Sequence, residues 1–260
     1  MKLEVDSQMH RELVESIDFA DDRLIPVWER VQAGQRLSFQ EGLLLFQTED
    51  IIGLGKMADH VRRQASGDQA YFVINRHINP TNICVLSCRF CDFARRKGDA
   101  GAYEMTLDEI LALVDDDIRE VHIVGGHHPD WPLERYEEIV RAIHERFPAV
   151  QIKAFTAAEI DYFSKRWKLS AEEILTRLQR AGLATMPGGG AEVFSDRVRK
   201  LLFPGKADAR RWLEIHRVAH SLGIYSNATM LYGHIETYEE RVQHMILLRD
   251  LQDETGGFLT

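Results

Sequence analysis

Three cysteines in one short stretch are the residues of this chain best suited to chemistry. Cys84, Cys88 and Cys91 are separated by three and then two residues, and the 260-residue chain contains no other cysteine. Thiolates are soft ligands that bind zinc or iron–sulfur clusters. Three thiolates are one fewer than a closed zinc site or an ordinary four-cysteine cluster uses. The sequence therefore predicts a metal centre in which one position stays open for a group that does not come from the protein.

A zinc site is the main alternative for these cysteines. A histidine such as His77 would complete four ligands, as in a zinc knuckle that staples a binding module. Zinc sites often combine two Cys-x-x-Cys elements, and the chain has no second pair. Three unrelated buried thiols are a further alternative. A shared metal centre is the favoured interpretation.

Composition and charge limit the partners of the chain. An apolar content of 45% with 28% charged residues is ordinary for a globular protein. The formal net charge of −9 argues against a nucleic-acid partner and against an anionic membrane, because both attract basic surfaces. Apolar runs are far shorter than the ~20 residues that span a bilayer, and the first ten residues lack a signal-peptide core. Three clustered cysteines make a poor disulfide framework and favour a reducing cytoplasm.

Short apolar runs that alternate with helical segments predict the elements that carry the site. Three of the helical segments begin with capping boxes, at Thr106, Ser170 and Thr237. The five predicted strands are Tyr71–Ile74, Glu120–Val124, Val150–Thr156, Leu183–Met186 and Ile224–Leu231. This alternation predicts an α/β fold with a parallel sheet. A doubly wound sheet is one possibility, but polar and glycine-rich stretches repeatedly follow the strands, which favours a partial (β/α) barrel of the TIM type.

The two ends of the chain lie outside this repeating pattern. Residues 1–66 are predicted to form an N-terminal helical segment, with helices over 7–66, a capping box at Ser38 and a further helix start at Thr48. The barrel is assigned to 67–260. Its last three residues, Phe258 to Thr260, have the pattern of a strand that is just beginning. We therefore expect a fragment or an unusually short member of its family, with the last part of the barrel missing.

The loops after the second and third predicted strands contain the next candidate residues. Gly125 and Gly126 allow another group to approach the backbone closely. His127 and His128, which follow them, are candidates for binding a substrate carboxylate or moving a proton; the alternative is that they fix the loop by hydrogen bonds. Thr156 with Glu159 is a candidate for ligand binding, although a helix cap is the favoured interpretation for this pair.

The loop after the fourth predicted strand has the sequence Pro-Gly-Gly-Gly-Ala-Glu, which ends at Glu192. Three successive glycines suit a loop where a ligand crosses the backbone. Arg197 and Arg199 follow at a helix start and are candidates for meeting a carboxylate. A flexible turn followed by a basic surface helix is the alternative.

The fifth predicted strand contributes polar side chains on one face. Asn227 and Thr229 alternate with apolar residues, so both are expected to point into the barrel near a ligand. His234 and Glu236 follow in the next loop and are candidates for substrate binding. For these two residues a surface loop or a helix cap is an equal alternative.

Several motifs together resemble a known family. Three cysteines at this spacing, with Phe90 before the last one, resemble the signature of radical S-adenosylmethionine enzymes. Four segments extend the likeness to the aminodeoxyfutalosine synthases of the futalosine route to menaquinone: Ile78–Asn82, Gly125–Asp130, Pro187–Glu192 and Asn227–His234. The likeness runs from about residue 38 to the end. Cyclic dehypoxanthinyl futalosine synthase and the deazaflavin-forming synthase of coenzyme F420 share the glycine-rich loop, but the double histidine favours the first family.

The resemblance implies a specific set of cofactor ligands. Cys84, Cys88 and Cys91 are expected to bind a 4Fe–4S cluster whose open iron S-adenosylmethionine chelates. The backbone of Gly125 and Gly126 is expected to accept hydrogen bonds from the methionine ammonium, and here His127 stands where the motif usually has an acid. Four further residues are assigned to cofactor binding: Thr156, Glu192, Asn227 and Thr229.

The resemblance also implies the reaction. One electron, from a donor such as flavodoxin or ferredoxin, enters the sulfonium and produces the 5′-deoxyadenosyl radical. This radical adds to the double bond of 3-[(1-carboxyvinyl)oxy]benzoate, and loss of the carboxyl carbon as bicarbonate gives 6-amino-6-deoxyfutalosine. Because the substrate has two carboxylates, His127, His128 and His234 are predicted to be the catalytic residues that meet them.

Overall fold

The computed structural model describes residues 18–260, and the chain divides into two compact units whose boundary along the sequence falls between Phe72 and Val73. The part of the predicted helical segment before residue 18 lies outside the described residues. The described part of the first unit contains a 3₁₀ turn, η1 (Asp22–Leu24), and three α-helices. These helices are α2 (Ile25–Gln32), α3 (Phe39–Gln47) and α4 (Ile51–Ser66). A small apolar cluster around Val27, Trp28 and Met57 holds them together.

The helix starts of the first unit follow from local side-chain caps. Ser38 and Glu41 form the predicted capping box at the start of α3. The start of α4 is corrected: Asp50, not Thr48, is its N-cap, because the Asp50 carboxylate accepts a hydrogen bond from the amide of Gly53 at 2.8 Å. Thr48 Oγ1 instead accepts from the amide of Asp50.

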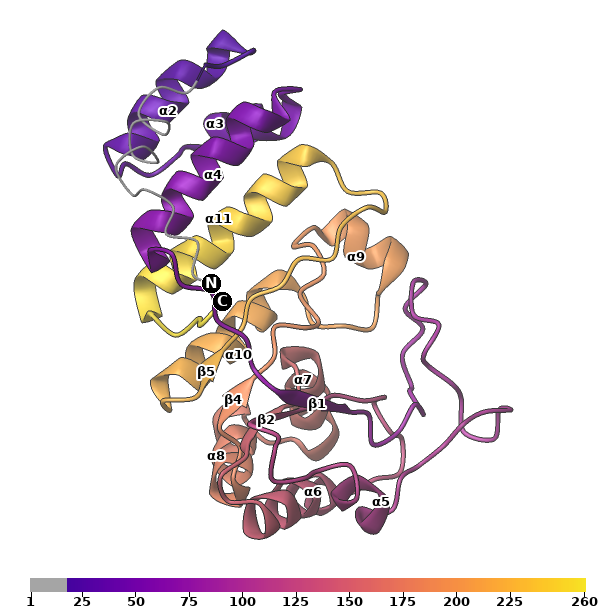
Figure 1. Cartoon of the computed structure of the whole chain (residues 1–260). Helices are drawn as coiled ribbons and strands as arrows, with labels where there is room; N and C mark the ends of the chain where they lie inside the picture. The colour runs from indigo at the N-terminus through magenta and orange to yellow at the C-terminus, as the bar shows by residue number, and fades with distance from the viewer. Residues whose placement is uncertain (1–17) are drawn as a thin grey trace. The chain divides into compact units, whose positions relative to one another are not determined.

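The second unit is built on a five-stranded parallel sheet whose spatial order equals its order along the chain (Figure 1). The strands are β1 (Asn75–Ile78), β2 (Glu120–Ile123), β3 (Gln151–Ala154), β4 (Thr185–Met186) and β5 (Tyr225–Ser226). Each βα unit thus adds its strand beside the previous one. A doubly wound sheet would reverse this order at a switch point. The α/β fold with a partial (β/α) barrel is therefore confirmed.

The first strand begins later than the sequence predicted. Tyr71–Ile74 is not a strand, and its side chains are largely exposed, with Phe72 90% accessible. The strand is Asn75–Ile78, which within the described part of the chain pairs with β2 alone and so lies at the edge of the five-stranded sheet. Polar side chains such as Asn75 and Arg76 are tolerated there because three of its four residues stay exposed.

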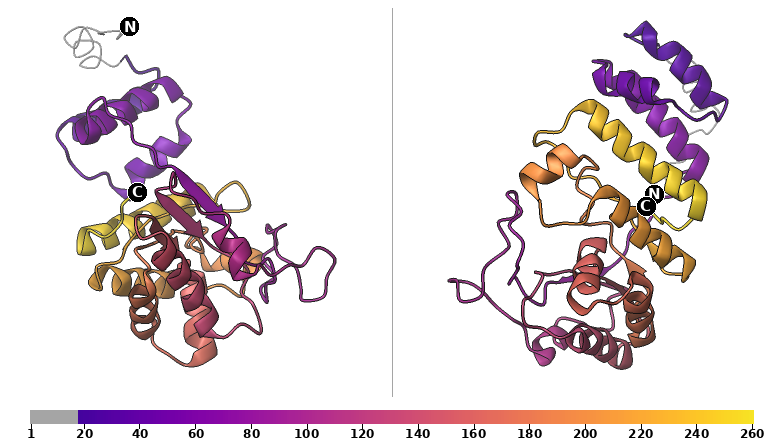
Figure 2. Two further views of the ribbon diagram at one scale, coloured as in Figure 1. Left: turned by 60° about the horizontal axis from the view of Figure 1, so that its bottom comes forward. Right: turned by 180° about the vertical axis from the view of Figure 1, so that it is seen from behind.

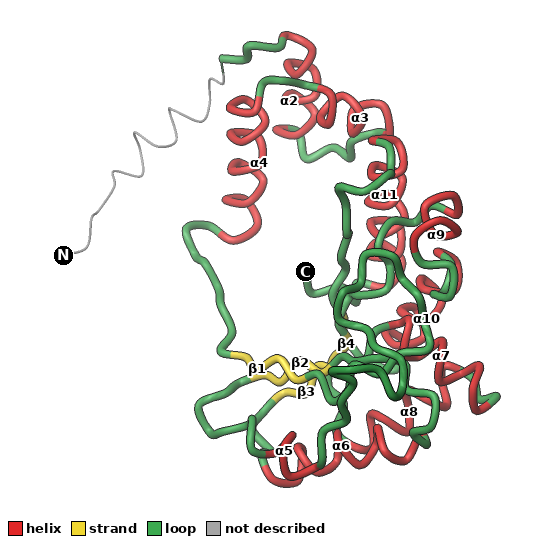
Figure 3. Tube along the Cα trace, turned by 90° about the vertical axis from the view of Figure 1, so that its right-hand side faces the viewer, coloured by secondary structure: helices red, strands yellow, loops and turns green. Residues whose placement is uncertain are grey.

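Helices α6 (Leu133–Arg146), α7 (Ala157–Trp167), α8 (Ala171–Ala181) and α10 (Ala209–Ser221) pack together beside the strands (Figure 3). The remaining helices of the unit are α5 (Leu107–Leu111), α9 (Asp196–Leu202) and α11 (Tyr238–Thr255). The predicted capping boxes at Thr106, Ser170 and Thr237 are confirmed. Within residues 18–260, no helix combines the length and the apolar character needed to cross a bilayer.

A long connection, residues 79–106, follows β1 and extends away from the strands (Figure 2). It carries the three cysteines and contains only isolated bridges, such as the one between Ile83 and Arg95. At the other end of the sheet, Phe258 pairs in parallel with Ser226 of β5, and the amide of Leu259 donates to the Ser226 carbonyl at 2.8 Å. The last residues therefore do begin a further parallel strand, as predicted.

Candidate functional site

The loops that follow the first four strands line one cavity with about 730 Å³ of empty space, part of which is open to solvent. Parallel strands present their carboxyl ends on the same side, so loops far apart in the sequence meet there. The residues predicted to bind ligand that line the cavity are Cys84, Cys88, Cys91, Gly125, Gly126, His127, Thr156 and Glu192. Four predicted residues do not line it: His128, Asn227, Thr229 and His234.

The three cysteines are half-buried, carry no disulfide, and all contribute to the cavity wall. Burial raises the pKa of the Cys88 thiol. The charge of Lys206 opposes this rise, and the neighbouring Cys84 and Cys91 add to it. Across the described range, 18–260, no three His, Cys, Asp or Glu side chains surround one point as a single metal ion requires. A cubane cluster has a different demand, because each thiolate binds a different iron atom.

Gly126 brings the cysteine loop and the loop after β2 into direct contact. A Cβ atom at this position would lie 2.2 Å from the backbone oxygen of Ile83, the residue before Cys84. Two hydrogen bonds join the loops at the same place: Gly126 N–H donates to Thr81 O at 2.9 Å, and Val85 N–H donates to His127 O at 3.0 Å. Only glycine permits this approach, which aligns the cysteines with the glycine pair.

His127 is a buried, neutral residue on the cavity wall. Its side chain is 94% buried, its ring centroid lies 5.0 Å from that of Tyr162, and Nδ1 has no hydrogen-bond partner among residues 18–260. Burial, reinforced by the charge of Lys206, lowers the pKa of His127 to about 3. A neutral imidazole with a free nitrogen can form a hydrogen bond with a ligand, but it supplies no positive charge.

His128 points away from the cavity and fixes its own loop. Its Nδ1 accepts hydrogen bonds from the amides of Asp130 and Trp131, at 3.0 and 3.1 Å. Nε2 lies 3.2 Å from a carboxylate oxygen of Glu104, at an angle outside hydrogen-bond geometry. Since Nδ1 accepts, the proton sits on Nε2. The geometry corresponds to the loop-fixing alternative for this residue.

Thr156 and Glu159 form a capping box at the start of α7, as the favoured sequence interpretation had it. The Glu159 carboxylate also accepts a hydrogen bond from the amide of Gly125 at 3.1 Å, so it links the loops after β2 and β3. Burial raises the pKa of Glu159 to about 7, and the hydrogen bonds from Thr156 and Gly125 oppose that rise. One carboxylate thus acts as cap, loop link and part of the cavity wall.

Glu192 is paired with a lysine that the sequence analysis did not single out. Its carboxylate forms a hydrogen-bonded ion pair with Lys206, and both side chains are largely buried on the cavity wall. Burial works against the charge of Lys206, but the negative charge of Glu192 and the hydrogen bond to it hold the pKa of Lys206 above its ordinary value. The ammonium also lies 5.3 Å from the ring centroid of Phe90, beside the last cysteine. No local pattern marks Lys206, which follows a Pro-Gly turn.

The polar residues after β5 join loops instead of lining the cavity. Thr229 Oγ1 donates to Gly188 O at 2.6 Å, in the glycine-rich loop after β4. The Asn227 amide group donates to Thr260 Oγ1. Both residues therefore support the neighbouring strands and loops directly, and a ligand contact for either stays a prediction.

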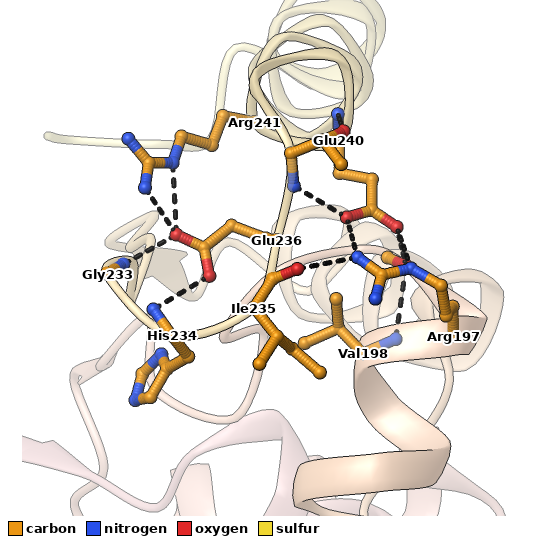
Figure 4. A network of polar contacts seen from close by, with 10 residues as sticks. Arg197, Val198, Gly233, His234, Ile235, Glu236, Glu240 and Arg241 are labelled. Atoms are coloured by element: carbon orange, nitrogen blue, oxygen red, sulfur yellow. Dashed lines mark hydrogen bonds and ion pairs between the residues drawn. The ribbon is translucent and has the colours of Figure 1, made fainter.

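His234 lies in a loop that a network of ion pairs holds firmly (Figure 4). Glu236 accepts hydrogen bonds from the amides of Gly233 and His234 and from the guanidinium of Arg241. Burial opposes its ionisation, but these donors lower the pKa of Glu236 to about 2. The exposed His234 ring lies 5.5 Å from that of Phe90, which itself lines the cavity.

The two arginines at the start of α9 are used within the protein. Arg197 binds the carboxylate of Glu240 and donates to Ile235 O at 2.7 Å, which secures the same loop (Figure 4). Arg199 lies beside Asp196 on its own helix. Neither arginine lines the cavity, so a contact with a substrate carboxylate is not part of this geometry.

The donors on the cavity wall fit an iron–sulfur cluster with an added zwitterionic ligand. Three thiols supply soft ligands for three irons and leave the fourth iron to another group. Beside them, Gly125, Gly126, Gly189 and Gly190 expose backbone, and Glu192 with Lys206 supplies one charge of each sign. A Cβ on Gly190, whose φ is +90°, would lie 2.8 Å from the Ala158 Cβ, so the loop needs glycine there.

Comparison with known families gives one broad match. The model of the "Radical SAM superfamily" matches residues 78–248. This range begins at the end of β1 and runs into α11, and it includes every residue that lines the cavity.

Curated relatives match nearly the whole chain. The aminodeoxyfutalosine synthase of Thermus thermophilus is 52% identical over 92% of this chain and 66% of its own length. The aminodeoxyfutalosine synthase of Streptomyces coelicolor is 42% identical over 88% of the chain and 60% of its own. The cyclic dehypoxanthine futalosine synthase of the same organism is 40% identical over 90% of this chain and 61% of its own length. The chain thus spans between 60% and 66% of these relatives.

Solved structures support the fold. Methylornithine synthase (PylB) has a TM-score of 0.69 at 18% identity and covers 86% of this chain and 64% of its own. The [FeFe]-hydrogenase maturase HydG has a TM-score of 0.68, also at 18% identity, and the match covers 98% of this chain and 57% of HydG. At such low identity these two structures establish the fold alone.

Proposed function

The chain belongs to the radical SAM superfamily, and on that premise we propose that it acts as an aminodeoxyfutalosine synthase. In this reaction the 5′-deoxyadenosyl group of S-adenosylmethionine is added to 3-[(1-carboxyvinyl)oxy]benzoate, giving 6-amino-6-deoxyfutalosine for menaquinone biosynthesis. The observation that carries the proposal is the 52% identity to the Thermus thermophilus enzyme. The cyclic dehypoxanthine futalosine synthase is more distant, at 40%.

The cavity residues suggest how each cofactor would be held. Cys84, Cys88 and Cys91 would bind the 4Fe–4S cluster, and the backbone of Gly125 and Gly126 would accept hydrogen bonds from the methionine ammonium. Two further residues, Thr156 and Glu192, are assigned to the adenosyl part. When bound, the cluster and S-adenosylmethionine supply the 5′-deoxyadenosyl radical.

The remaining cavity residues would bind and orient the substrate. His127 is neutral and has a free Nδ1, so it would hold a substrate oxygen or carboxylic group by a hydrogen bond instead of by charge. Lys206 is the only lysine or arginine on the described cavity wall, and its ion pair with Glu192 holds it in place. His234, beside Phe90, would meet a carboxylate that extends out of the cavity. His128 would keep the loop in register.

Two conditions complete the proposal. The cluster needs a one-electron donor, and a small carrier such as flavodoxin or ferredoxin is proposed for it. The reaction is placed in the cytoplasm, where free thiols stay reduced.

The test is a product assay under anaerobic conditions. The reconstituted protein receives a reductant, S-adenosylmethionine and 3-[(1-carboxyvinyl)oxy]benzoate, and the mixture is examined by mass spectrometry. Formation of 6-amino-6-deoxyfutalosine supports the proposal, and a Cys88→Ala control should form none. If only 5′-deoxyadenosine accumulates, the proposed function is wrong and a hydrogen-abstracting relative is favoured.

A further inference from the structure

We infer that His244 of α11 is a positioning residue that locks the glycine-rich loop after β4 to the loop after β5, and thereby holds Glu192 on the cavity wall. Its effect on cofactor affinity rests on the proposed function. Its effect on the two loops does not.

His244 joins the loops through both ring nitrogens. Its side chain is fully buried, and Nδ1 accepts a hydrogen bond from the amide of Phe194 at 3.1 Å. On its other side, Nε2 lies 3.0 Å from the carbonyl oxygen of Thr229. Since Nδ1 accepts, the proton must sit on Nε2 and be donated to Thr229. The ring therefore has one functional tautomer, and each nitrogen serves a different loop.

The same two loops touch at several points around Glu192. Leu231 N–H donates to the carbonyl of Glu192 at 3.0 Å, and Thr229 Oγ1 donates to Gly188 O at 2.6 Å. A Cβ on Gly188 would lie 2.6 Å from Asn227 O, so the backbones pass in close contact. The His244 side chain, which is 0% exposed, makes its two hydrogen bonds beside this contact zone.

Glu192 needs such support because its backbone is strained. Its φ is +47°, in the left-handed region that non-glycine residues rarely adopt. Conformations of this kind persist only where the surrounding structure imposes them, and they concentrate at functional sites. The carboxylate that this backbone presents is the one paired with Lys206 on the cavity wall. His244 acts on Glu192 through Phe194, which binds the His244 ring and follows Glu192 by two residues in the sequence.

Burial also keeps His244 in the neutral state that the lock requires. Burial lowers the pKa of His244 to about 4, although the hydrogen bond to Thr229 opposes this decrease. A protonated ring would place an N–H against the Phe194 N–H and lose that bond. Phe194 packs on the ring, with centroids 4.3 Å apart.

The half-buried His220 of α10 offers a matched control. His220 of α10 also makes two side-chain hydrogen bonds, to Ser226 at 2.8 Å and to Thr255 at 2.7 Å. Neither of these hydrogen bonds involves Phe194 or Thr229. Loss of His220 should therefore cost stability without loosening the loop that carries Glu192.

Two substitutions separate the two bonds. In His244→Gln the terminal amide can still donate to Thr229, but Phe194 loses its acceptor. In His244→Asn the shorter side chain can accept from Phe194, but it no longer reaches Thr229. Hydrogen exchange measured by NMR should show the Phe194 amide exchanging about tenfold faster, or more, in H244Q and near the wild-type rate in H244N, because an unsatisfied buried amide is costly.

Both variants should also weaken binding of S-adenosylmethionine to the cluster-loaded protein by about tenfold, measured by calorimetry. His220→Gln should lower the melting temperature and leave this affinity within about twofold. Nitrogen chemical shifts of wild-type His244 should show the Nε2–H tautomer.

Three results would overturn the inference. They are an Nδ1–H tautomer, an unchanged Phe194 exchange rate in H244Q, or equal losses of affinity in H244Q and H220Q. Failure of the wild-type protein to bind S-adenosylmethionine would instead count against the proposed function, because the tautomer and exchange results do not depend on it.

Discussion

Replacing Gly126 by alanine should separate the cysteine loop from the loop after β2. The added Cβ would lie 2.2 Å from Ile83 O and 2.6 Å from the Ile83 carbonyl carbon. Both are backbone atoms, so no side-chain rotation relieves the contact. Ordinary contact begins near 3.4 Å, so the Ile83 backbone must retreat by 3.4 − 2.2, or about 1.2 Å. Cys84, the next residue, must move with it.

The energetic cost has two sources. Overpacking against backbone costs about 1–3 kcal/mol. The two hydrogen bonds that join the loops, from Gly126 to Thr81 and from Val85 to His127, contribute about 0.5–1.5 kcal/mol each if lost. The free energy of unfolding should therefore fall by about 2–6 kcal/mol. A domain with a stability of about 10 kcal/mol, in the middle of the typical range, would remain folded while its cysteine loop is displaced.

The assay compares stability and iron content in the same samples. Urea denaturation gives the free energy of unfolding, and iron per chain after anaerobic reconstitution reports the cysteine loop. Gly55→Ala is the control, because Gly55 lies inside α4 with no atom near its Cβ position, and alanine there should stabilise by up to about 1 kcal/mol. Wild-type iron content and stability in Gly126→Ala would refute the close-contact argument.

Three further substitutions test other parts of the site. Cys88→Ala should abolish the brown colour and iron retention, while a colourless wild-type protein holding one zinc would contradict the cluster. The pKa of Glu159 is raised to about 7, so between pH 4.5 and about 7 the folded protein binds a proton that the unfolded chain has released. The free energy of unfolding should therefore fall as the pH rises through that range, and Glu159→Gln should remove this slope. An identical pH profile in the variant would disprove the assignment. Glu236 has the opposite sign, since its stabilisation is present above pH 4.5 and lost as the pH falls toward 2. Glu236→Gln should cost about 1.5–3 kcal/mol at pH 7 and flatten that acid limb, as urea titrations would show.

Much of the second unit was predictable because its rules are local. Capping boxes such as Thr106 with Glu109 satisfy backbone donors within four residues, so the pattern alone marks a helix start. The later strands lie within short apolar runs of the sequence and most of their residues are buried, although Gln151 and Tyr225 stay exposed. The first strand was misplaced because Asn75–Ile78 lies at the sheet edge, where polar residues are accommodated, while the more apolar Tyr71–Ile74 stays exposed.

The candidate site was predictable where the chemistry depends on residue type, and not where it depends on distant partners. The cysteines and glycines are recognisable in sequence. The direction of the His128 ring is different, because it depends on Glu104, which is distant in the sequence, as well as on the nearby amides of Asp130 and Trp131. Lys206 becomes a site residue only because the turn after α9 brings it to Glu192. The role of His244 depends on two loops that are distant from it in the sequence.

The most direct test of the central claim is electron paramagnetic resonance of the reduced, reconstituted protein before and after addition of S-adenosylmethionine. If three cysteines hold a 4Fe–4S cluster and leave one iron open beside the glycine loops, the spectrum of the reduced cluster should change when S-adenosylmethionine is added. The Cys88→Ala variant should show no cluster signal, either before or after the addition. A reduced-cluster spectrum that is identical with and without S-adenosylmethionine would contradict the claim.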